Sequence, residues 1–500
     1  MIEKPPTSPN KKAKKTSALS YVFLVLLGIS VCSFLQMRGL LHAYDSIGSN
    51  DQDATHPQTT SAIESSLHAF KSAGKKEPAA IVEDHESVAV EDPIPNPEPT
   101  IGSESFSACL LVMDDNHRLV EWMAYHYHVL PLRYLVIAVD PRSKTSPTAI
   151  LNRWRTMGVY VEEWDDFNFM RKDIASNKIG DDQDLQIKRD RHRMRQKNFY
   201  QACLRRMKAQ NRTYTTLIDT DEYITYNYKG GDQFEAWEKK RKQITRKIPI
   251  YKGKTRVLPS SVPPTTGEEG ALLKFIRTEQ KAGTPFFQGA CISCPRLQFG
   301  SKESSEEERK HGIPESLKID PFRLDTLRFR LHAERQDFVK NGLSKSILDV
   351  SRIDKFPKIQ SLHRPIKSIC SAPWKDEWSS ALRINHYLGS WEAYSFRDDS
   401  RRGGERSFEG WAFKAKEGDD TDDNIRPWVD GFVQTHGPDK ATDLLKDAGL
   451  PRGMKGNDKN WTIMFLDEIL SVNKTEGNPM RVAFDNFVRD FHLNEKQTPN

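Results

Sequence analysis

Three nearly continuous apolar segments, separated by helical patterns, most strongly constrain the fold of this 500-residue chain. The apolar segments are 108–113, 134–139 and 159–162, and helical spacing of apolar residues occupies 119–129 and 147–157. Strands that are apolar along their whole length are buried on both faces, and in parallel sheets they alternate with helices. The sequence therefore predicts an α/β fold whose sheet is covered by helices on both faces.

Acidic side chains stand at the carboxyl ends of several predicted strands, where open α/β sheets bind their ligands. These acids are Asp114 and Asp115 after the first strand, Asp140 after the second, and Asp219 after a β-favouring segment at 214–218. A binding site lined by acids is therefore expected at one edge of the sheet.

The β-favouring segment leads into the sequence Asp219-Thr220-Asp221-Glu222. In an extended chain, residues two apart point to the same face, so Asp219 and Asp221 would aim at one point. Two carboxylates there suit Mg²⁺ or Mn²⁺ carrying a phosphate better than they suit zinc. Glu222 is either a third ligand or the structural partner of a Lys or Arg. The alternative for the whole stretch is an ordinary turn after a strand.

Two histidines, His363 and His386, each end a short segment flanked by apolar residues. A neutral imidazole is a suitable third ligand for a divalent metal that carboxylates already hold. The alternative for either histidine is a structural role. The sequence thus provides a candidate metal site of Asp219, Asp221 and one of these two histidines.

A densely basic segment, 188–197, lies in an amphipathic helical pattern that extends to Lys208. It is expected either to be a solvated helix face or to supply one or two groups that pair with a bound diphosphate. Phe199, Cys203 and Met207 recur at four-residue spacing, which predicts a buried stripe. Cys203 is therefore expected to be a core residue rather than a reactive thiol.

The six cysteines are too few for a disulfide-rich scaffold. Cys32 lies in an apolar run, and the odd number that remains predicts at least one free thiol if that part of the chain is extracytoplasmic. Cys291 and Cys294 have the spacing of half a zinc site, but the sequence contains no second such pair. We therefore expect two thiols or a local disulfide there.

The N-terminal region has the organisation of a membrane anchor followed by a spacer. Lysines precede an uncharged apolar run at 18–35, which is close to the roughly 20 residues that cross a bilayer. We expect a cytoplasmic tail at 1–17, a transmembrane signal anchor at 18–37 and a disordered, proline-ended stem at 38–103. A cleaved signal peptide is the alternative, although the run is long for one and no Ala-x-Ala site follows.

This topology places the remainder of the chain in a lumen, which is the plan of single-pass type II enzymes of Golgi or other secretory-pathway membranes. Three Asn-x-Thr sequons, at Asn211, Asn460 and Asn473, are compatible with that route. The net charge of +6 is small against 75 basic and 69 acidic residues, so it does not indicate a nucleic-acid partner. A C-terminal extension at 416–500, without chemistry of its own, is expected to contain helices at 441–449 and 463–472.

The order of these segments resembles that of family 92 glycosyltransferases and related family-2-like enzymes. The matching blocks lie at 108–116, 119–126, 134–140, 217–223, 291–300, 384–387 with 390–392, and Arg402-Gly403. The first block departs from the family's Asn-Glu, because this chain has Asp115-Asn116 there. Loops at 248–270 and 301–318 have no counterpart in the family, which leaves the acceptor open.

The resemblance implies a GT-A-type fold at 104–415, which is a mixed sheet that binds a nucleotide sugar and carries helices on both faces. It also implies a divalent metal, Mn or Mg, held by Asp219 and Asp221. His386 is slightly ahead of His363 as the third ligand, because the block that contains it matches the family better. Such a metal neutralises the charge that develops on the departing diphosphate.

For the nucleotide, the resemblance implies contacts from Asp114 or Asp115 to the nucleoside, and from Asp140 to uridine or ribose. The expected activity is transfer of a hexose, in the manner of a galactosyltransferase, from a UDP-linked sugar to a glycan or glycoprotein, with inversion. Inversion requires a base within hydrogen-bond reach of the acceptor hydroxyl. The sequence does not separate three candidates for this base, which are Glu303, Asp325 and Asp337.

The main alternative is a catalytically inactive, membrane-tethered protein of the same fold that binds a carbohydrate or a nucleotide. The intact Asp219 and Asp221 favour the enzyme. A helix–loop–helix calcium site would need further acids and a central glycine after Asp221, and residues 222–224 do not supply them. A phosphohydrolase would need a nucleophile or a second metal cluster, for which no dense set of His and Asp is found.

Overall fold

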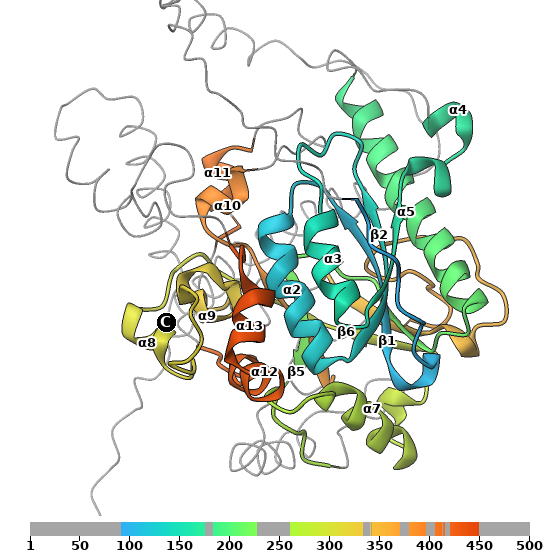
Figure 1. Ribbon diagram of the computed structural model, residues 1–500. Coiled ribbons are helices and arrows are strands. Elements are labelled where there is room, and N and C mark those ends of the chain that lie inside the picture. Colours follow the sequence, from blue (N-terminus) through green and yellow to red (C-terminus); the bar gives the residue numbers. More distant parts are fainter. Residues whose placement is uncertain are drawn as a thin grey trace, which may run out of the picture. The chain divides into compact units, whose positions relative to one another are not determined.

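A six-stranded mixed sheet forms the centre of the described chain, with the strand order β3-β2-β1-β4-β8-β6 (Figure 1). The strands are β1 (Phe106–Val112), β2 (Leu132–Val139), β3 (Tyr160–Trp164), β4 (Tyr214–Thr216), β6 (Cys291–Cys294) and β8 (Lys345–Asp349). The strands β1 to β4 pair in parallel, whereas β8 is antiparallel to both β4 and β6. The sheet expected from the sequence is therefore present, and the fold is α/β with a mixed sheet.

The computed structural model describes residues 92–175, 184–227, 261–333, 341, 343–370, 380–396, 406–412, 414–415 and 421–449. Within those ranges, no helix is both long enough and apolar enough to cross a membrane. The expected tail, the anchor at 18–37 and most of the stem lie outside the described residues. So do Asp337, the Arg402-Gly403 block, two of the sequons and the helix expected at 463–472.

Helices cover both faces of this sheet, as the apolar strands require. On one face, α2 (Asn116–Val129) and α3 (Thr148–Thr156) share a buried cluster with alternate residues of β1 and β2 such as Leu110 and Ile137. On the other face, the intervening residues, such as Val136, pack with α5 (Leu185–Ala209). The two-residue period of the strands thus divides one sheet between two apolar clusters.

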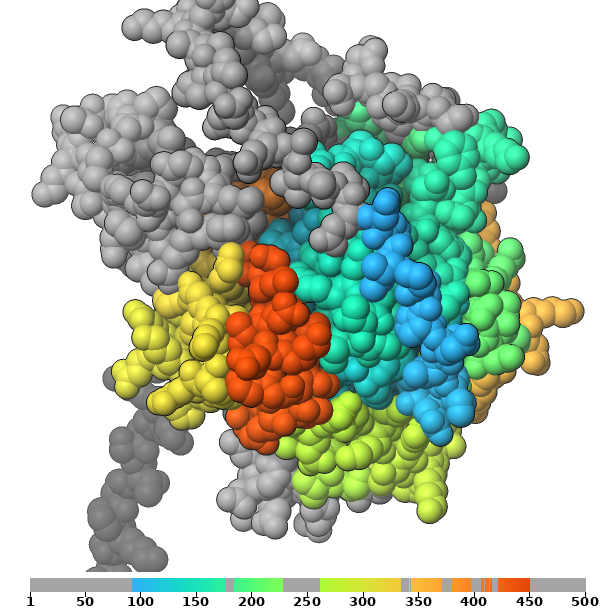
Figure 2. All heavy atoms as spheres, in the orientation of Figure 1, coloured from blue at the N-terminus to red at the C-terminus, as the bar shows by residue number. Residues whose placement is uncertain are grey.

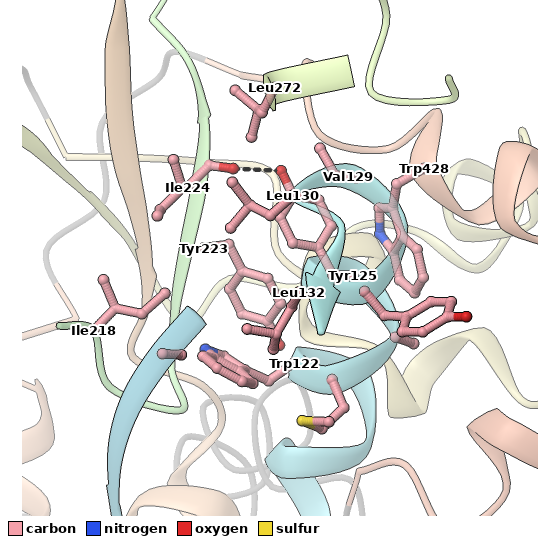
Figure 3. Packing of buried hydrophobic residues seen from close by; sticks show 14 of the residues in the cluster. Trp122, Tyr125, Val129, Leu130, Leu132, Ile218, Tyr223, Ile224, Leu272 and Trp428 are labelled. Carbon is pink, nitrogen blue, oxygen red and sulfur yellow. Dashed lines mark hydrogen bonds between the residues drawn. The ribbon is translucent and has the colours of Figure 1, made fainter. Parts of the chain in front are cut away.

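A second sheet has three strands, in the order β5 (Glu222–Tyr226), β9 (Leu382–Tyr387) and β7 (Arg296–Phe299). The central strand β9 is antiparallel to β5 and parallel to β7. The Tyr125 hydroxyl on α2 donates a hydrogen bond of 2.6 Å to the carbonyl oxygen of Ile224 on β5 (Figure 3). Helix α2 therefore packs against the central sheet and is also tied to the second one.

The remaining helical segments are short and connect or cover these sheets. They are α4 (Lys172–Ala175), α7 (Ala271–Lys281), α8 (Glu306–Lys310), α9 (Asp325–Arg328), α10 (Trp391–Ser395), α11 (Phe408–Ala412), α12 (Trp428–His436), α13 (Pro438–Leu445) and the 3-10 turns η3 (Gly102–Glu104), η4 (Asp166–Asn168), η5 (Pro285–Phe287), η6 (Pro321–Arg323) and η8 (Val350–Arg352).

The C-terminal helices α12 and α13 pack beside α2 (Figure 1). Trp428 and Phe432 of α12 are completely buried and belong to the same apolar cluster as Leu110. Residues 421–449 are therefore part of the core, not an extension outside the domain expected at 104–415. The expected helix at 441–449 corresponds to α13.

The proline-rich segment after residue 91 is bound to the folded domain, so a disordered stem cannot extend to 103. The backbone N–H of Ile94 donates to Oδ1 of Asn152 at 3.1 Å, and the N–H of Val161 donates to Oδ1 of Asn96 at 2.8 Å. Prolines hold this segment extended, which leaves its polar backbone groups available to α3 and β3. Figure 2 shows it as the blue segment along the surface of the domain.

The described cysteines form two long-range disulfides, Cys109–Cys203 and Cys291–Cys370. Among the described residues, Cys294 is the free, buried thiol. The expectation of two thiols is wrong, because Cys291 is bonded to Cys370, and a local disulfide is wrong as well, because residues three apart in a strand point to opposite faces of the sheet. Cys203 is buried in the core as predicted, and its sulfur bridges α5 to β1.

Candidate functional site

The candidate site lies where the strand order of the central sheet reverses direction. Strand β1 pairs with β2 on one side and with β4 on the other. In open α/β sheets, ligands bind outside the carboxyl ends of the strands at such a switch point. Asp114 follows β1 and Asp219 follows β4, so the acids predicted at the strand ends flank this position.

The Asp219-Thr220-Asp221 segment is a turn that connects the two sheets, not an extended continuation of β4. The N–H of Glu222 donates to the carbonyl oxygen of Asp219 at 3.1 Å, and the N–H of Asp219 donates to Oε2 of Glu222 at 3.0 Å. The expectation that two-residue alternation aligns the carboxylates is therefore wrong, because a turn does not preserve it. The turn instead brings Asp219 and Asp221 together at the end of one sheet and the start of the other.

Lys345, the first residue of β8, holds Asp219 and Glu222 together. Its Nζ lies 2.8 Å from Oδ2 of Asp219 and 3.0 Å from Oε2 of Glu222, and its side chain is only 2% exposed. Burial acts to raise the pKa of Asp219, but Lys345 outweighs burial and holds that pKa below its ordinary value. Burial raises the pKa of Glu222 to about 7, although Lys345 opposes the shift. Glu222 is thus the structural partner of a lysine, one of its two predicted roles.

Asp221 contacts a different pair of groups. Its Oδ2 accepts a hydrogen bond from Nη1 of Arg118 at 3.2 Å and lies 3.7 Å from Nε2 of His386. Arg118 is 7% exposed, and its Nη2 donates to the carbonyl oxygen of Leu388 at 2.8 Å. The next residue, Gly389, has a φ of 80°, and a Cβ there would collide with Nη2 of Arg118. A glycine is therefore required both by the backbone conformation and by the position of the guanidinium.

Both predicted histidines lie in this cluster. His386 on β9 is directly opposite Glu222 of β5, and burial lowers its pKa to about 3. Burial, together with Lys345 and Arg296, lowers the pKa of His363 to about 4, and its Nδ1 lies 3.0 Å from the carbonyl oxygen of Ser344. Both imidazoles are consequently neutral near pH 7, which is the form that binds metals.

The donor set fits a hard divalent cation in chemistry, and Asp221 with His386 fits it in spacing. Two atoms that bind one ion at roughly 2.1 Å lie about 3 to 4 Å apart, and Asp221 Oδ2 and His386 Nε2 are 3.7 Å apart. Over the described ranges, no group of three or more His, Cys, Asp or Glu side chains is arranged to hold a metal. The Asp219 carboxylate accepts a hydrogen bond from Nζ of Lys345 at 2.8 Å.

The other predicted nucleotide-binding acids stabilise the neighbouring loop. Oδ1 of Asp114 accepts hydrogen bonds from the N–H groups of Lys144 and Thr145 at 2.7 and 3.1 Å. Oδ1 and Oδ2 of Asp140 each accept from the Arg142 guanidinium at 3.0 Å. Asp115 is buried immediately before α2. All three acids lie at the predicted edge, and the carboxylates of Asp114 and Asp140 order the loop after β2.

The basic run on α5 contains one residue that faces this edge. Arg195 is buried, and its Nη1 lies 3.5 Å from Oδ2 of Asp140 while its Nε donates to Asp166 at 2.6 Å. Arg189 and Arg193 of the same run are exposed. The run therefore has a solvated face and one inward-facing arginine, and pairing with a diphosphate stays a prediction.

The structure separates two of the three predicted base candidates. Glu303 is completely buried and forms ion pairs with both Arg309 and Arg328. Asp325 lies with its Oδ2 3.6 Å from Nε of Arg118, the same guanidinium that contacts Asp221. Asp325 therefore belongs to the cluster, whereas Glu303 belongs to a neighbouring ion-pair network.

Sequence reasoning missed the cations of this site, which are Arg118, Lys345 and Arg296. Arg296 on β7 is buried, and burial lowers its pKa, although the nearby charges of Glu222, Asp221 and Asp219 oppose that shift. One signal was available, because a lysine in a short, otherwise β-favouring strand needs a buried acidic partner. The sequence did not show which acid is that partner, since Lys345 and Asp219 are 126 residues apart.

Glu121 on α2 provides a pH-dependent contribution to stability. Burial and the charge of Asp325 raise its pKa to about 8, from an ordinary value of 4.5. Between these two values the folded state holds a proton that the unfolded state has lost, so the free energy of unfolding falls as pH rises. Relative to wild type, Glu121→Gln is expected to gain roughly 3–4 kcal/mol between pH 5 and pH 8.

Urea denaturation at four pH values across this range measures that gain. The exposed Glu307→Gln on α8 is the matched control, and its difference from wild type should not change with pH. A Glu121→Gln difference that is equally constant would show that Glu121 titrates normally in the folded state.

No protein-family model matches the chain, and the comparison with curated proteins found no match. The function must therefore be argued from the site itself.

Proposed function

We propose that the chain is a metal-dependent glycosyltransferase with a GT-A-type fold, similar to family 92 enzymes. It transfers a hexose from a nucleotide sugar, UDP-linked, to a glycan or glycoprotein acceptor with inversion at the anomeric carbon. The observation that carries this proposal is the Asp219-Thr220-Asp221 turn at the switch point of the sheet, with His386 3.7 Å from Asp221.

Asp219, Asp221 and His386 would hold the divalent ion, Mn²⁺ or Mg²⁺. When bound, such an ion neutralises the negative charge on the departing diphosphate. The other residues of the chain keep these groups in place before the donor arrives. Arg118 fixes Asp221, and Lys345 fixes Asp219 against Glu222.

The charges of the cluster also support a diphosphate ligand. Asp219, Asp221 and Glu222 face three cations, which are Arg118, Lys345 and Arg296. A divalent cation that arrives with an anionic diphosphate adds little net charge to this cluster, in which the three cations face these three acids and Asp325. Such pairing limits the cost of desolvating the bound complex.

The disulfides support the secretory localisation that we propose. Cys109–Cys203 and Cys291–Cys370 are long-range bridges between structural elements, and such bonds persist in oxidising compartments. We therefore propose a single-pass type II protein of the Golgi or another secretory-pathway membrane, with the described domain in the lumen. The membrane contact would be the anchor at 18–37.

The test is Mn²⁺-dependent binding of UDP to the purified chain, measured by calorimetry, with a panel of nucleotide sugars screened for hydrolysis. Asp219→Asn and Asp221→Asn together are expected to weaken Mn²⁺-dependent UDP binding at least about 100-fold, because both remove anionic ligands while keeping side-chain shape. Asp190→Asn, an exposed acid on α5, is the matched control and should bind normally.

UDP binding that survives the double substitution would refute the metal role of the two acids. Normal UDP binding without turnover of any donor would favour the alternative, a catalytically inactive nucleotide- or carbohydrate-binding protein of the same fold.

A further inference from the structure

The guanidinium of Arg118 holds Asp325 beside Asp221, one of the two aspartates that would bind the metal. Arg118 contacts Oδ2 of Asp221 through Nη1 at 3.2 Å and Oδ2 of Asp325 through Nε at 3.6 Å. Both ion pairs are largely buried, since the Asp221 and Asp325 side chains are 14% and 15% exposed. One cation thus holds two acids, each of which keeps limited access to solvent.

Glu121 on α2 fixes the backbone position of Asp325. Oε2 of Glu121 accepts a hydrogen bond from the N–H of Asp325 at 2.7 Å, and its Oε1 accepts from the N–H of Thr326 at 3.0 Å. Glu121 lies three residues after Arg118, so the two side chains leave the same face of the helix. On helix α2, Glu121 therefore orients the backbone of Asp325, and Arg118 orients the Asp325 carboxylate.

The other acids in this region are less suited to receive a proton from a substrate. The Glu303 side chain is 0% exposed and is bound by Arg309 and Arg328. Glu121 is 2% exposed, and its two oxygens accept backbone hydrogen bonds. Asp325 combines partial exposure with direct contact to the cation that orders Asp221.

We propose that Asp325 is the general base of the transfer reaction, an assignment that rests on the proposed function. The acceptor O–H bond breaks and its proton passes to the Asp325 carboxylate. The acceptor oxygen forms a bond to the anomeric carbon. The bond between that carbon and the diphosphate oxygen breaks, and its electron pair leaves with the diphosphate. Arg118 is a positioning residue that aligns this base with Asp221.

The electrostatic surroundings of Asp325 agree with this role. Burial raises its pKa, and Asp221 and Glu303 raise it further, whereas Arg118 and Arg328 lower it. A raised carboxyl pKa strengthens the group as a base near neutral pH.

The test compares water and azide as acceptors for whichever nucleotide sugar the wild-type chain hydrolyses. Asp325→Asn is expected to lower hydrolysis by about 100- to 10,000-fold, while Mn²⁺-dependent UDP binding stays unchanged. Azide attacks as an anion and releases no proton, so the rate of glycosyl azide formation should stay within about threefold of wild type. Glu307→Gln is the control and should preserve all three measurements.

Asp325→Ser provides a second variant if asparagine impairs folding, and retained UDP binding identifies folded protein in each case. Unchanged hydrolysis in a folded variant would overturn the assignment. Equal loss of hydrolysis and azide transfer would also overturn it, because the residue would then be structural. A wild-type chain that neither binds UDP with Mn²⁺ nor hydrolyses any donor would overturn the proposed function itself.

Discussion

Lys345→Met is expected to lower the free energy of unfolding by about 3–5 kcal/mol, because it leaves a completely buried carboxylate without its cation. Lys345 contacts Glu222 at 3.0 Å and Asp219 at 2.8 Å, and Glu222 is 0% exposed. Methionine keeps most of the side-chain volume, so the lost charge dominates over any cavity. Urea denaturation at pH 9, well above the pKa of about 7 that Glu222 has beside Lys345, measures the effect.

A double-mutant cycle separates the ion pair from packing. Adding Glu222→Gln to Lys345→Met should recover part of the lost stability, since it removes the stranded charge. Lys274→Met on α7, whose side chain is 68% exposed, is the control and should change stability by no more than about 0.5 kcal/mol. A similarly small effect at position 345 would show that Glu222 is stable in the core without its partner.

The interior of the central sheet was predictable because hydrophobic periodicity is local. The apolar runs that became β1 and β2 and the helix between them can each be identified within a short window of sequence. Their acids were predictable for the same reason, since each directly follows its strand. The parallel pairing of β1, β2 and β3 then follows from the helices that connect them.

The interactions within the site were not predictable, because they join distant parts of the chain. Arg118 and Asp221 are 103 residues apart, and only the fold brings them within 3.2 Å. The change from β4 to a second sheet was also hidden, since a β-favouring run gives no sign of which sheet it enters. The structure brings Asp219 and Asp221 to the same turn, although the extended geometry predicted for them was wrong, and their role as metal ligands stays a prediction.

The pairing of the cysteines was not predictable either, because the bonded residues are far apart in sequence. Removing one of these disulfides is expected to have a large effect on stability. Cys109→Ala with Cys203→Ala is expected to lower the free energy of unfolding by about 4 kcal/mol, because the bond closes a loop across 94 residues and limits the unfolded chain. That loop contains β2, β3 and most of α5, which covers one face of the sheet. Urea denaturation under non-reducing conditions measures the loss.

The matched control is Cys294→Ala, which removes a buried thiol but no cross-link and should cost no more than about 1 kcal/mol. Alkylation of the unfolded, unreduced chain should modify Cys294 but neither Cys109 nor Cys203. If the double variant were as stable as the control, the bond would contribute nothing to the fold. If Cys109 were alkylated in protein purified from the secretory pathway, the proposed lumenal location would lose its structural support, because an oxidising compartment would have closed the bridge.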